Sequence, residues 1–307
     1  MIISASRRTD IPACYAEWFM NRLNAGYAMM PNPRNPNRIG RVSLSPDIVD
    51  CIVFWTKNPA PMLPMLAQIE KMGYAFYFQF TLTPYGSDIE ADLPPKAELE
   101  STFITLSRTI GAERVQWRYD PIIVDSTHTI HWHTAQFERL CQALHGATTR
   151  CIISFVDPYK SLGNAFRALT NSEIFLLAER FSGIAAAHGI SLFTCAEAID
   201  LSAYGLSHAS CIDQGIIERI IGSSIIAKPD RNQRPGCGCI ESVDIGAYDT
   251  CGNGCRYCYA TDSRQRALAA LEQHDPSAPM LTGYPQGHEI ITDRTTASQR
   301  DAQIRFW

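Results

Sequence analysis

Three cysteines near the end of the chain, Cys251, Cys255 and Cys258, have a spacing suited to holding a metal centre. They lie in the stretch CGNGCRYCYA, which follows a strand-like run and precedes a predicted helix. A tight loop can aim three thiolates at one point, and Gly252 and Gly254 allow the backbone to fold around a cluster. Three thiolates can hold three irons of a 4Fe-4S cluster and leave the fourth iron open to a small ligand, whereas a closed site needs a fourth ligand. The alternative is therefore zinc, with a fourth cysteine from the nearby CGC.

Four further cysteines in the C-terminal third of the chain predict a second metal site. They are Cys195 in TCAE, Cys211 in SCID, and Cys237 and Cys239 in GCGC. Four is the number of ligands in a closed 4Fe-4S or zinc site. The alternative is that Cys195 is a small buried strand residue and Cys211 a helix-packing one. The remaining four of the eleven cysteines sit in apolar or helical patterns and are most simply core residues: Cys14, Cys51, Cys141 and Cys151.

An alternation of strands and helices must position these cysteines. Seven β-rich runs are predicted: MIISAS (1–6), DCIVFWTK (50–57), FYFQFTLT (76–83), RVQWRYDPI (114–122), RCIISFVD (150–157), ISLFTCAE (190–197) and SVDIGAY (242–248). Amphipathic stretches predict helices at 15–24, 60–72, 96–110, 134–144, 172–188 and 261–274. Strands rich in Ile, Val and Phe, separated by such helices, indicate βαβ units and a mostly parallel sheet. Seven strands favour an α/β fold of the TIM-like (β/α) barrel or partial-barrel type.

A single α/β domain over residues 1–274, including the cysteine-rich segment 195–260, accommodates this pattern. With 46% hydrophobic and 19% charged residues, the chain can bury a substantial core. Residues 225–240 lack periodicity and are predicted to be a loop. Residues 275–307 are rich in turn formers and are predicted to form a tail along the surface.

Polar residues follow the predicted strands. In α/β barrels the C-terminal strand ends form the rim of the active site, although polar residues also end strands simply because they meet solvent. Arg118 and Asp120 point to the same side of one strand, so they could pair structurally or hold a substrate. The histidines of HTIHWH, namely His128, His131 and His133, fit no helix-face zinc pair and are predicted to be solvated loop residues. The other strand-end residues are Arg7, Arg8, Asp10, Lys57, Asn58, Thr81, Thr83, Asp157 and Glu197.

The cysteine spacing resembles a known motif. Cys-x3-Cys-x2-Cys with an aromatic residue before the last cysteine, here CGNGCRYC, resembles the cluster motif of the radical S-adenosylmethionine (SAM) superfamily. The fuller CRYCYA resembles the branch that contains spore photoproduct lyase and the DNA repair photolyase-like proteins. In those families the motif follows the first barrel strand, near the N-terminus, whereas here it comes last. Neighbouring first and last strands let a barrel chain begin elsewhere without changing the site, so the resemblance implies a circular permutation.

Further short matches follow when the sequence is read from SVDIGAYDTCGNGCRYCYA and continued at residue 1. SASRRTDIPA resembles the Thr-Asp turn after the second strand of those relatives, and VFWTKNPAPMLPML resembles their strand that ends in Thr-Lys. FQFTLTPYGSDIEADLPP and LSRTIGAERVQWRYDPII resemble their next two strands. The whole chain also resembles a bacterial family described only as a domain of unknown function.

The resemblance implies a radical SAM enzyme acting on an unidentified substrate. The open cluster would chelate SAM, cleave it reductively and so abstract hydrogen, with electrons from a donor such as flavodoxin or ferredoxin. Lys57, the lysine of the Thr-Lys match, would bind the SAM carboxylate; the alternative is an ion pair on the barrel rim. Thr9, Asp10 and Thr81 occupy strand ends that could complete the polar cradle. Because many such enzymes carry auxiliary clusters, iron–sulfur is favoured over zinc at the second site.

Bulk properties limit the partners. The net charge of -4 gives no general attraction to nucleic acid, although a basic N-terminal segment could supply a local surface. No secretory signal is visible and no apolar run reaches the roughly 18 residues of a membrane span, so we expect a cytoplasmic protein without a membrane partner. The competing function is a non-catalytic zinc- or iron–sulfur-binding module, which could be associated with nucleic acid. A narrower alternative, an enzyme acting on DNA lesions, rests on the resemblance alone.

Overall fold

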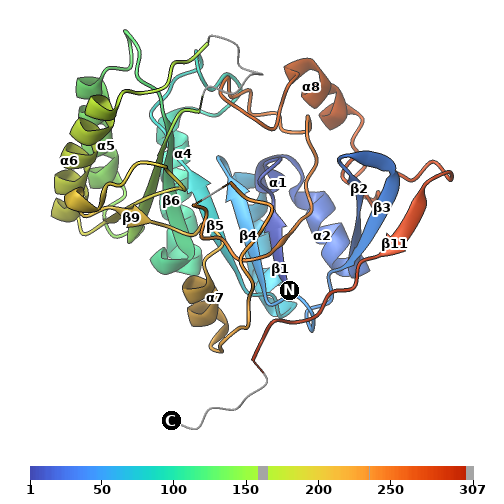
Figure 1. Ribbon diagram of the computed structural model, residues 1–307. Helices are drawn as coiled ribbons and strands as arrows, with labels where there is room; N and C mark the ends of the chain where they lie inside the picture. Colours follow the sequence, from blue (N-terminus) through green and yellow to red (C-terminus); the bar gives the residue numbers. More distant parts are fainter. Residues whose placement is uncertain (158–164, 235, 302–307) are drawn as a thin grey trace.

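An eight-stranded parallel sheet forms the centre of the protein (Figure 1). The computed structural model describes residues 1–157, 165–234 and 236–301. The strand order is β10 (Val243–Asp244), β1 (Ile2–Ala5), β4 (Cys51–Thr56), β5 (Phe76–Thr81), β6 (Val115–Ile122), β7 (Arg150–Phe155), β8 (Ser191–Thr194) and β9 (Ser207–His208). The α/β class, the parallel sheet and all seven predicted strands are confirmed. Within the described residues β10 and β9 are the two edges of the sheet, which is therefore open rather than closed into a barrel.

The helices agree with the prediction in position, with shifts at their ends. They are α2 (Ala16–Ala25), α4 (Lys96–Ile110), α5 (Ile130–Ala143), α6 (Asn171–Ala187) and α8 (Arg264–Glu272). The helix predicted at 60–72 begins as the 3-10 helix η1 (Ala60–Met65) and continues as α3 (Leu66–Lys71), because the internal Pro64 cannot donate the hydrogen bond that an α-helix needs there. The prediction missed α1 (Ile11–Cys14) and α7 (Gln214–Ile221). The described residues also form two short 3-10 helices, η2 (Ala112–Arg114) and η4 (Ser202–Tyr204), and the short edge strand β9.

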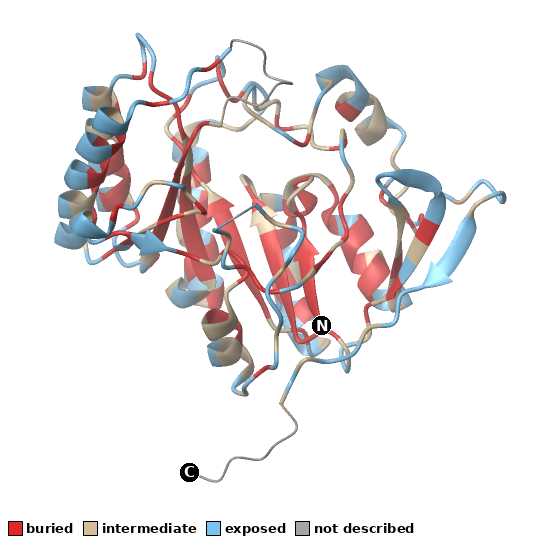
Figure 2. Cartoon of the chain, in the orientation of Figure 1, coloured by how far each residue is buried: buried red, intermediate tan, exposed pale blue. Residues whose placement is uncertain are grey.

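The central strands are buried on both faces, which is typical of parallel sheets. Alternate residues such as Phe54 and Phe78 belong to the large core cluster under the long helices. Their neighbours Val53 and Tyr77 belong to a second cluster, which α7 covers together with residues of the 225–240 loop. Figure 2 shows the strands as almost continuously buried, whereas the outer sides of α5 and α6 are exposed.

The second face of the sheet changes character along the strands. Near their start it is apolar, with Ile2 and Val53 fully buried. Toward their C-terminal ends the same face carries buried polar side chains, including Gln79, Arg118 and Ser154. Arg118 stands in register with Thr81 on β5 and with Ile152 on β7, so neighbouring strands deliver their polar ends to one place. This edge of the sheet holds the candidate site described below.

A second, three-stranded sheet was not predicted. It has the order β11 (Ile290–Asp293), β3 (Asn35–Ser43) and β2 (Tyr27–Asn32) (Figure 1). The hairpin of β2 and β3 is rich in Asn, Pro and Arg, and this composition conceals the strands because it is typical of loops. The tail contributes β11, and its Ala278 carbonyl accepts a hydrogen bond of 3.0 Å from the Trp18 indole. The segment predicted to be a tail thus pairs with β3 and buries Ala278, Met280 and Leu281. Residues 302–307, like Pro235 in the predicted loop, lie outside the described residues.

The prediction that the HTIHWH histidines are solvated loop residues is wrong for two of them. Helix α5 begins at Ile130 with Thr129 as its N-cap, so His133 lies one turn into the helix on its buried side. His133 is 0% exposed and contacts the Tyr119 hydroxyl at 2.8 Å, and burial lowers its pKa to about 4. His128 is buried against Trp132, with ring centroids 4.7 Å apart. Only His131 is exposed, as expected.

None of the helices in the described part of the chain combines the length and the apolar character needed to cross a bilayer.

The aromatic packing under the sheet gives a test of the core. Phe54 is 0% exposed and stacks on Phe78 with ring centroids 4.8 Å apart. We predict that Phe54→Ala lowers the free energy of unfolding by about 3–5 kcal/mol, because it removes buried contacts and leaves a cavity. The control Phe175→Ala, at a side chain 36% exposed, should change it by less than about 1 kcal/mol. Denaturant titration of both variants measures the difference, and equal losses would contradict this assignment of the core.

Candidate metal and cofactor site

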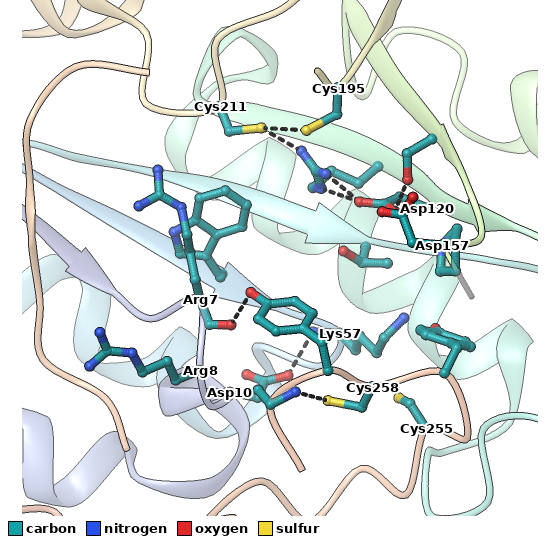
Figure 3. A pocket seen from close by; sticks show the side chains of 18 of the residues that line it. Arg7, Arg8, Asp10, Lys57, Asp120, Asp157, Cys195, Cys211, Cys255 and Cys258 are labelled. Carbon is teal, nitrogen blue, oxygen red and sulfur yellow. Dashed lines mark hydrogen bonds and ion pairs between the residues drawn. The ribbon is translucent and has the colours of Figure 1, made fainter. Parts of the chain in front are cut away.

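One cavity of about 430 Å³ lies at the C-terminal ends of the parallel strands and collects most of the residues that the sequence singled out, with Asn58, Thr83 and Glu197 outside its lining. Its walls include all seven cysteines of the two predicted sets, together with Thr9, Asp10, Lys57 and Thr81. Figure 3 shows Cys195 and Cys211 on one side of this space and Cys255 and Cys258 on the other. Within the described residues, no group of three or more His, Cys, Asp or Glu side chains is arranged as a metal site as it stands. Metal binding at either set would thus require the side chains to reorient.

The three-cysteine loop is held in place by backbone pairing with residues 86–92. Glu90 and Cys255 form an antiparallel bridge, and the Arg256 amide donates to the Ile89 carbonyl at 2.9 Å. Gly254 has a φ of +66°, and a Cβ at this position would lie 2.3 Å from a carboxylate oxygen of Asp92. Glycine is therefore required both by the backbone conformation and by the close approach of the two segments.

Glu90 is the buried centre of this pairing. Its side chain is 0% exposed and accepts hydrogen bonds from Lys57 at 2.8 Å and from the Thr83 hydroxyl at 2.8 Å. Lys96 and the hydroxyl of Tyr257, the aromatic residue before Cys258, also donate to it. Burial alone would raise the pKa of Glu90, but the two ammonium groups outweigh it and lower the pKa to about 2. The ionised carboxylate thus ties the cysteine loop to the strand that ends at Lys57.

The four residues predicted to cradle SAM differ in how much of their bonding capacity is free. Lys57 lines the cavity but forms the ion pair with Glu90, which is the alternative role considered for it. Asp10 caps α1 through the Ala13 amide and also accepts from the Lys57 amide at 2.7 Å and from Asn253 at 2.9 Å. Thr9 is buried, and its hydroxyl has no hydrogen-bond partner within the described residues. Thr81, the fourth residue, is half-buried and lines the same cavity. Of Lys57, Asp10 and Thr9, Thr9 is the one whose polar atom is left for a ligand among the described residues.

The second set of cysteines forms a continuous row of sulfur atoms. The sulfurs of Cys195 and Cys211 are 3.5 Å apart, and hydrogen bonds connect Cys211 to Cys239 and Cys239 to Cys237. Arg118 donates to the Cys211 sulfur at 2.8 Å and binds Asp120 through its other nitrogens. The predicted convergence of these four residues is thus present, although their sequence positions span more than forty residues. The pairing of Arg118 with Asp120 is also confirmed.

The directions of the pKa shifts alternate along this row. A hydrogen bond from Cys211 lowers the pKa of Cys195 to about 6, against the effect of burial and with help from Arg118. Hydrogen bonds from Cys211 and Cys237 lower the pKa of Cys239, and Arg7 adds to the effect. The pKa values of the two donors, Cys211 and Cys237, are raised by the same bonds. A metal ion bound here would displace the shared protons, because thiolates are the ligating form.

The pKa values of the three loop cysteines are all raised. Burial raises the pKa of Cys255, although Lys57 acts in the opposite direction, and burial also raises the pKa of Cys258. A hydrogen bond to Cys14 raises the pKa of Cys251, and burial adds to it. The fourth sulfur nearest this set is therefore Cys14, a residue expected to be core. The CGC cysteines, which were considered as a source of a fourth ligand, belong to the other row.

Some residues of the site were not found from the sequence. Glu90 sits in the polar stretch GSDIEADLPP and has no signal of burial, because its partners Lys57 and Lys96 are distant in the chain. Trp55 belonged to a predicted strand, but nothing indicated that its ring would lie between Arg7 and Arg118, whose guanidinium carbons are 5.1 and 5.4 Å from its ring centre. For Tyr257, the only signal in the sequence was that the motif has an aromatic residue before its last cysteine.

Fold and site together define an α/β protein with a parallel sheet and a cysteine-lined cavity at the C-terminal ends of its strands. Residues 2–260 match the family described as a domain of unknown function (DUF1848), and the chain belongs to that family. A comparison with curated proteins gave no match. Among solved structures, the chain is similar to a "putative alpha-L-fucosidase" from Bacteroides thetaiotaomicron at 12% identity and a TM-score of 0.27, with 50% of this chain and 64% of that chain covered. A likeness of that size carries no argument about fold or function.

The Glu90 network gives a prediction with a defined pH dependence. We predict that Glu90→Gln lowers the free energy of unfolding at pH 7 by about 3–5 kcal/mol, because it leaves two buried ammonium groups unpaired. The pKa of Glu90 is lowered from 4.5 to about 2, so its contribution is present above pH 4.5 and is lost as the pH falls toward 2. The gap in melting temperature between wild type and variant should therefore narrow below pH 4.5. Glu138→Gln, at an exposed helix position, is the control and should show no gap. A gap of the same size at pH 7 and pH 3 would refute the assignment.

Proposed function

We propose that this protein is a radical SAM enzyme that uses a 4Fe-4S cluster on Cys251, Cys255 and Cys258. The observation that carries the proposal is the position of the Cys-x3-Cys-x2-Cys loop. It follows a strand of the parallel sheet and lines a cavity at the C-terminal strand ends, where α/β barrels keep their catalytic groups. Three half-buried thiols on one loop suit a cluster with one open iron.

The strand order supports a circularly permuted partial barrel. β10 precedes the cysteine loop and pairs in parallel with β1, so the strand of this sheet that comes last in the sequence occupies the place before the first. From β1 to β9 the strands then follow one another across the sheet in chain order. That progression is typical of (β/α) barrels, whereas doubly wound sheets reverse direction in the middle. The rearranged order is the one expected if the relatives' first strand had been moved to the end.

The residues around the cavity divide the work of such an enzyme. When bound, the cluster and SAM would supply reductive cleavage of the sulfonium and hydrogen abstraction from the substrate. The Glu90 network would keep the cysteine loop fixed on the sheet, and Lys57 would place positive charge beside Cys255. Thr9 has a free hydroxyl for a polar group of SAM, while Asp10 orients the Lys57 amide.

We further propose a second metal site on Cys195, Cys211, Cys237 and Cys239, either 4Fe-4S or zinc. The Cys195 and Cys211 sulfurs are 3.5 Å apart, Cys239 interacts with both Cys211 and Cys237, and Arg118 beside Cys211 would offset the negative charge of bound thiolates. The 3.5 Å between the Cys195 and Cys211 sulfurs is close to the edge of a thiolate tetrahedron around one zinc ion, about 3.8 Å for a Zn–S bond of about 2.3 Å. A 4Fe-4S cube would need the sulfurs to move further apart. This spacing favours zinc over the iron–sulfur cluster that the resemblance suggested.

The second candidate function is a non-catalytic metal-binding module, and the compact row of four sulfurs is the observation in its favour. In that case both cysteine sets would bind zinc, and the cavity would not be an active site. Metal analysis of anaerobically purified protein separates the two functions. Iron near four atoms per chain, with an electron donor such as flavodoxin or ferredoxin able to reduce it, supports the enzyme; two zinc ions and no iron support the module.

Substitution of the loop cysteines tests the enzyme directly. We predict that Cys251→Ala, Cys255→Ala and Cys258→Ala each lose the iron of one cluster and all formation of 5′-deoxyadenosine from SAM under reducing, anaerobic conditions. Each change removes one of only three protein ligands to the cluster. Cys14→Ala is the matched control, since it removes the sulfur next to Cys251 and should keep both iron and cleavage. A loop variant that retained full iron, or a Cys14 variant that lost it, would show that the open site is misassigned.

The second site has its own test. We predict that Cys237→Ala combined with Cys239→Ala lowers metal content by one site and lowers the melting temperature, because the metal would crosslink a loop that has little apolar core of its own. The cluster on the first three cysteines should remain, as measured by its absorbance and iron content. Wild-type metal content together with an unchanged melting temperature would remove the case for a second site.

A further inference from the structure

The cavity contains buried hydrogen-bond donors that have no acceptor. Among its lining residues, three have a buried polar atom without a partner in the described part of the chain: Nη2 of Arg7, Nε1 of Trp55 and the Thr9 hydroxyl. The guanidinium of Arg7 and the indole N–H of Trp55 can only donate hydrogen bonds, and the Thr9 hydroxyl is able to donate one. A buried donor without a partner costs about 1–3 kcal/mol, so three in one cavity indicate acceptor atoms that a ligand would bring.

The arginines of the cavity differ in how well their charge is balanced. Arg7 approaches Asp230 at 3.8 Å and lies beside Cys239, the sulfur whose pKa it helps to lower. Arg118 is paired with Asp120 and Arg234 with Asp157, whereas the Arg8 side chain, which also lines the cavity, has no ion pair among the described residues. The least compensated charge is therefore that of Arg8, next to the free donor of Arg7, which lies beside Trp55.

The guanidinium group of Arg7 also lies away from the three-cysteine loop. The Arg7 carbonyl accepts a hydrogen bond of 2.7 Å from Tyr259, just past that loop, but its side chain extends toward Cys211 (Figure 3). A ligand group bound to Arg7 and Trp55 would therefore face SAM across the cavity rather than overlap it.

We propose that Arg7 and Trp55 bind an oxyanion of the substrate, a carboxylate or a phosphate, with Arg8 adding positive charge. This inference deepens the proposed function, since it names the class of substrate that the radical SAM site would act on. An oxyanion has the acceptor oxygens that the indole and guanidinium N–H groups lack, and a planar guanidinium can bind two of them at once.

The probes for the test are inorganic phosphate and acetate, added to the full-length protein purified without oxygen. At constant ionic strength, the better of the two should raise the melting temperature by at least about 2 °C relative to chloride, because a ligand that binds only the folded state stabilises it. Arg7→Gln and Trp55→Phe should abolish the shift. The Phe variant keeps an aromatic ring beside the arginines and removes only the N–H donor, so it remains informative if the Arg7 variant folds poorly. Arg108→Gln, at an exposed position on α4, is the matched control and should keep the full shift.

A second experiment tests whether the oxyanion and SAM bind to different parts of the cavity. With saturating SAM present, the shift caused by the oxyanion should persist in the wild-type protein, because the two ligands occupy different parts of the cavity. The proposal is overturned if neither probe exceeds chloride, if the Arg7 and Arg108 variants respond alike, or if SAM abolishes the shift. A different result would show that the proposed radical SAM function is wrong. In that case SAM would neither raise the melting temperature nor yield 5′-deoxyadenosine, while the oxyanion would still raise the melting temperature.

Discussion

The parallel pairing of β10 with β1 joins the two distant parts of the sequence on which the site depends. Ile3 stands opposite Val243 and Ser4 opposite Asp244. The Asp244 carboxylate then accepts hydrogen bonds from the hydroxyls of Ser4 and Ser6 and from the Arg7 amide, at 2.7 to 2.9 Å. This one carboxylate fixes the turn that carries Arg7, Arg8 and Thr9 against the strand that leads into the cysteine loop. Hydrogen bonds from Tyr259 to the Arg7 carbonyl and from Asn253 to Asp10 add to this connection.

Electrostatics at Glu90 complete what the strand pairing begins. A carboxylate that is fully buried is tolerated only when its charge is compensated and its oxygens are hydrogen-bonded. Here Lys57, Lys96, Thr83 and Tyr257 satisfy it, and they come from β4, α4, the end of β5 and the cysteine loop. Because a buried network of this kind is costly to break, the loop is held in one position before any metal binds. Such rigidity is what a cluster with an open coordination site requires from its protein.

The cavity combines groups of opposite chemical character. On one side lie three thiols whose pKa values are raised, and on the other a row of four sulfurs in which hydrogen bonds and arginines lower the pKa values of Cys195 and Cys239. Between them lie the free donors of Arg7, Trp55 and Thr9. In the proposed function, a substrate with acceptor oxygens would lie between two candidate metal centres, only one of which would have an open coordination position.

The sequence by itself determined the seven principal strands, the main helices and the two cysteine sets, because each depends on local spacing and periodicity. Alternating β-rich and amphipathic stretches define elements without reference to their neighbours, and Cys-x3-Cys-x2-Cys is a local pattern. Only the tertiary structure decided that Glu90 is buried, that Trp55 lies between Arg7 and Arg118, and that Cys14 approaches Cys251. These facts depend on strand register and loop pairing between residues far apart in the chain. The hairpin of β2 and β3 and the burial of His133 were missed for a related reason: tertiary packing overrode a composition that is typical of loops.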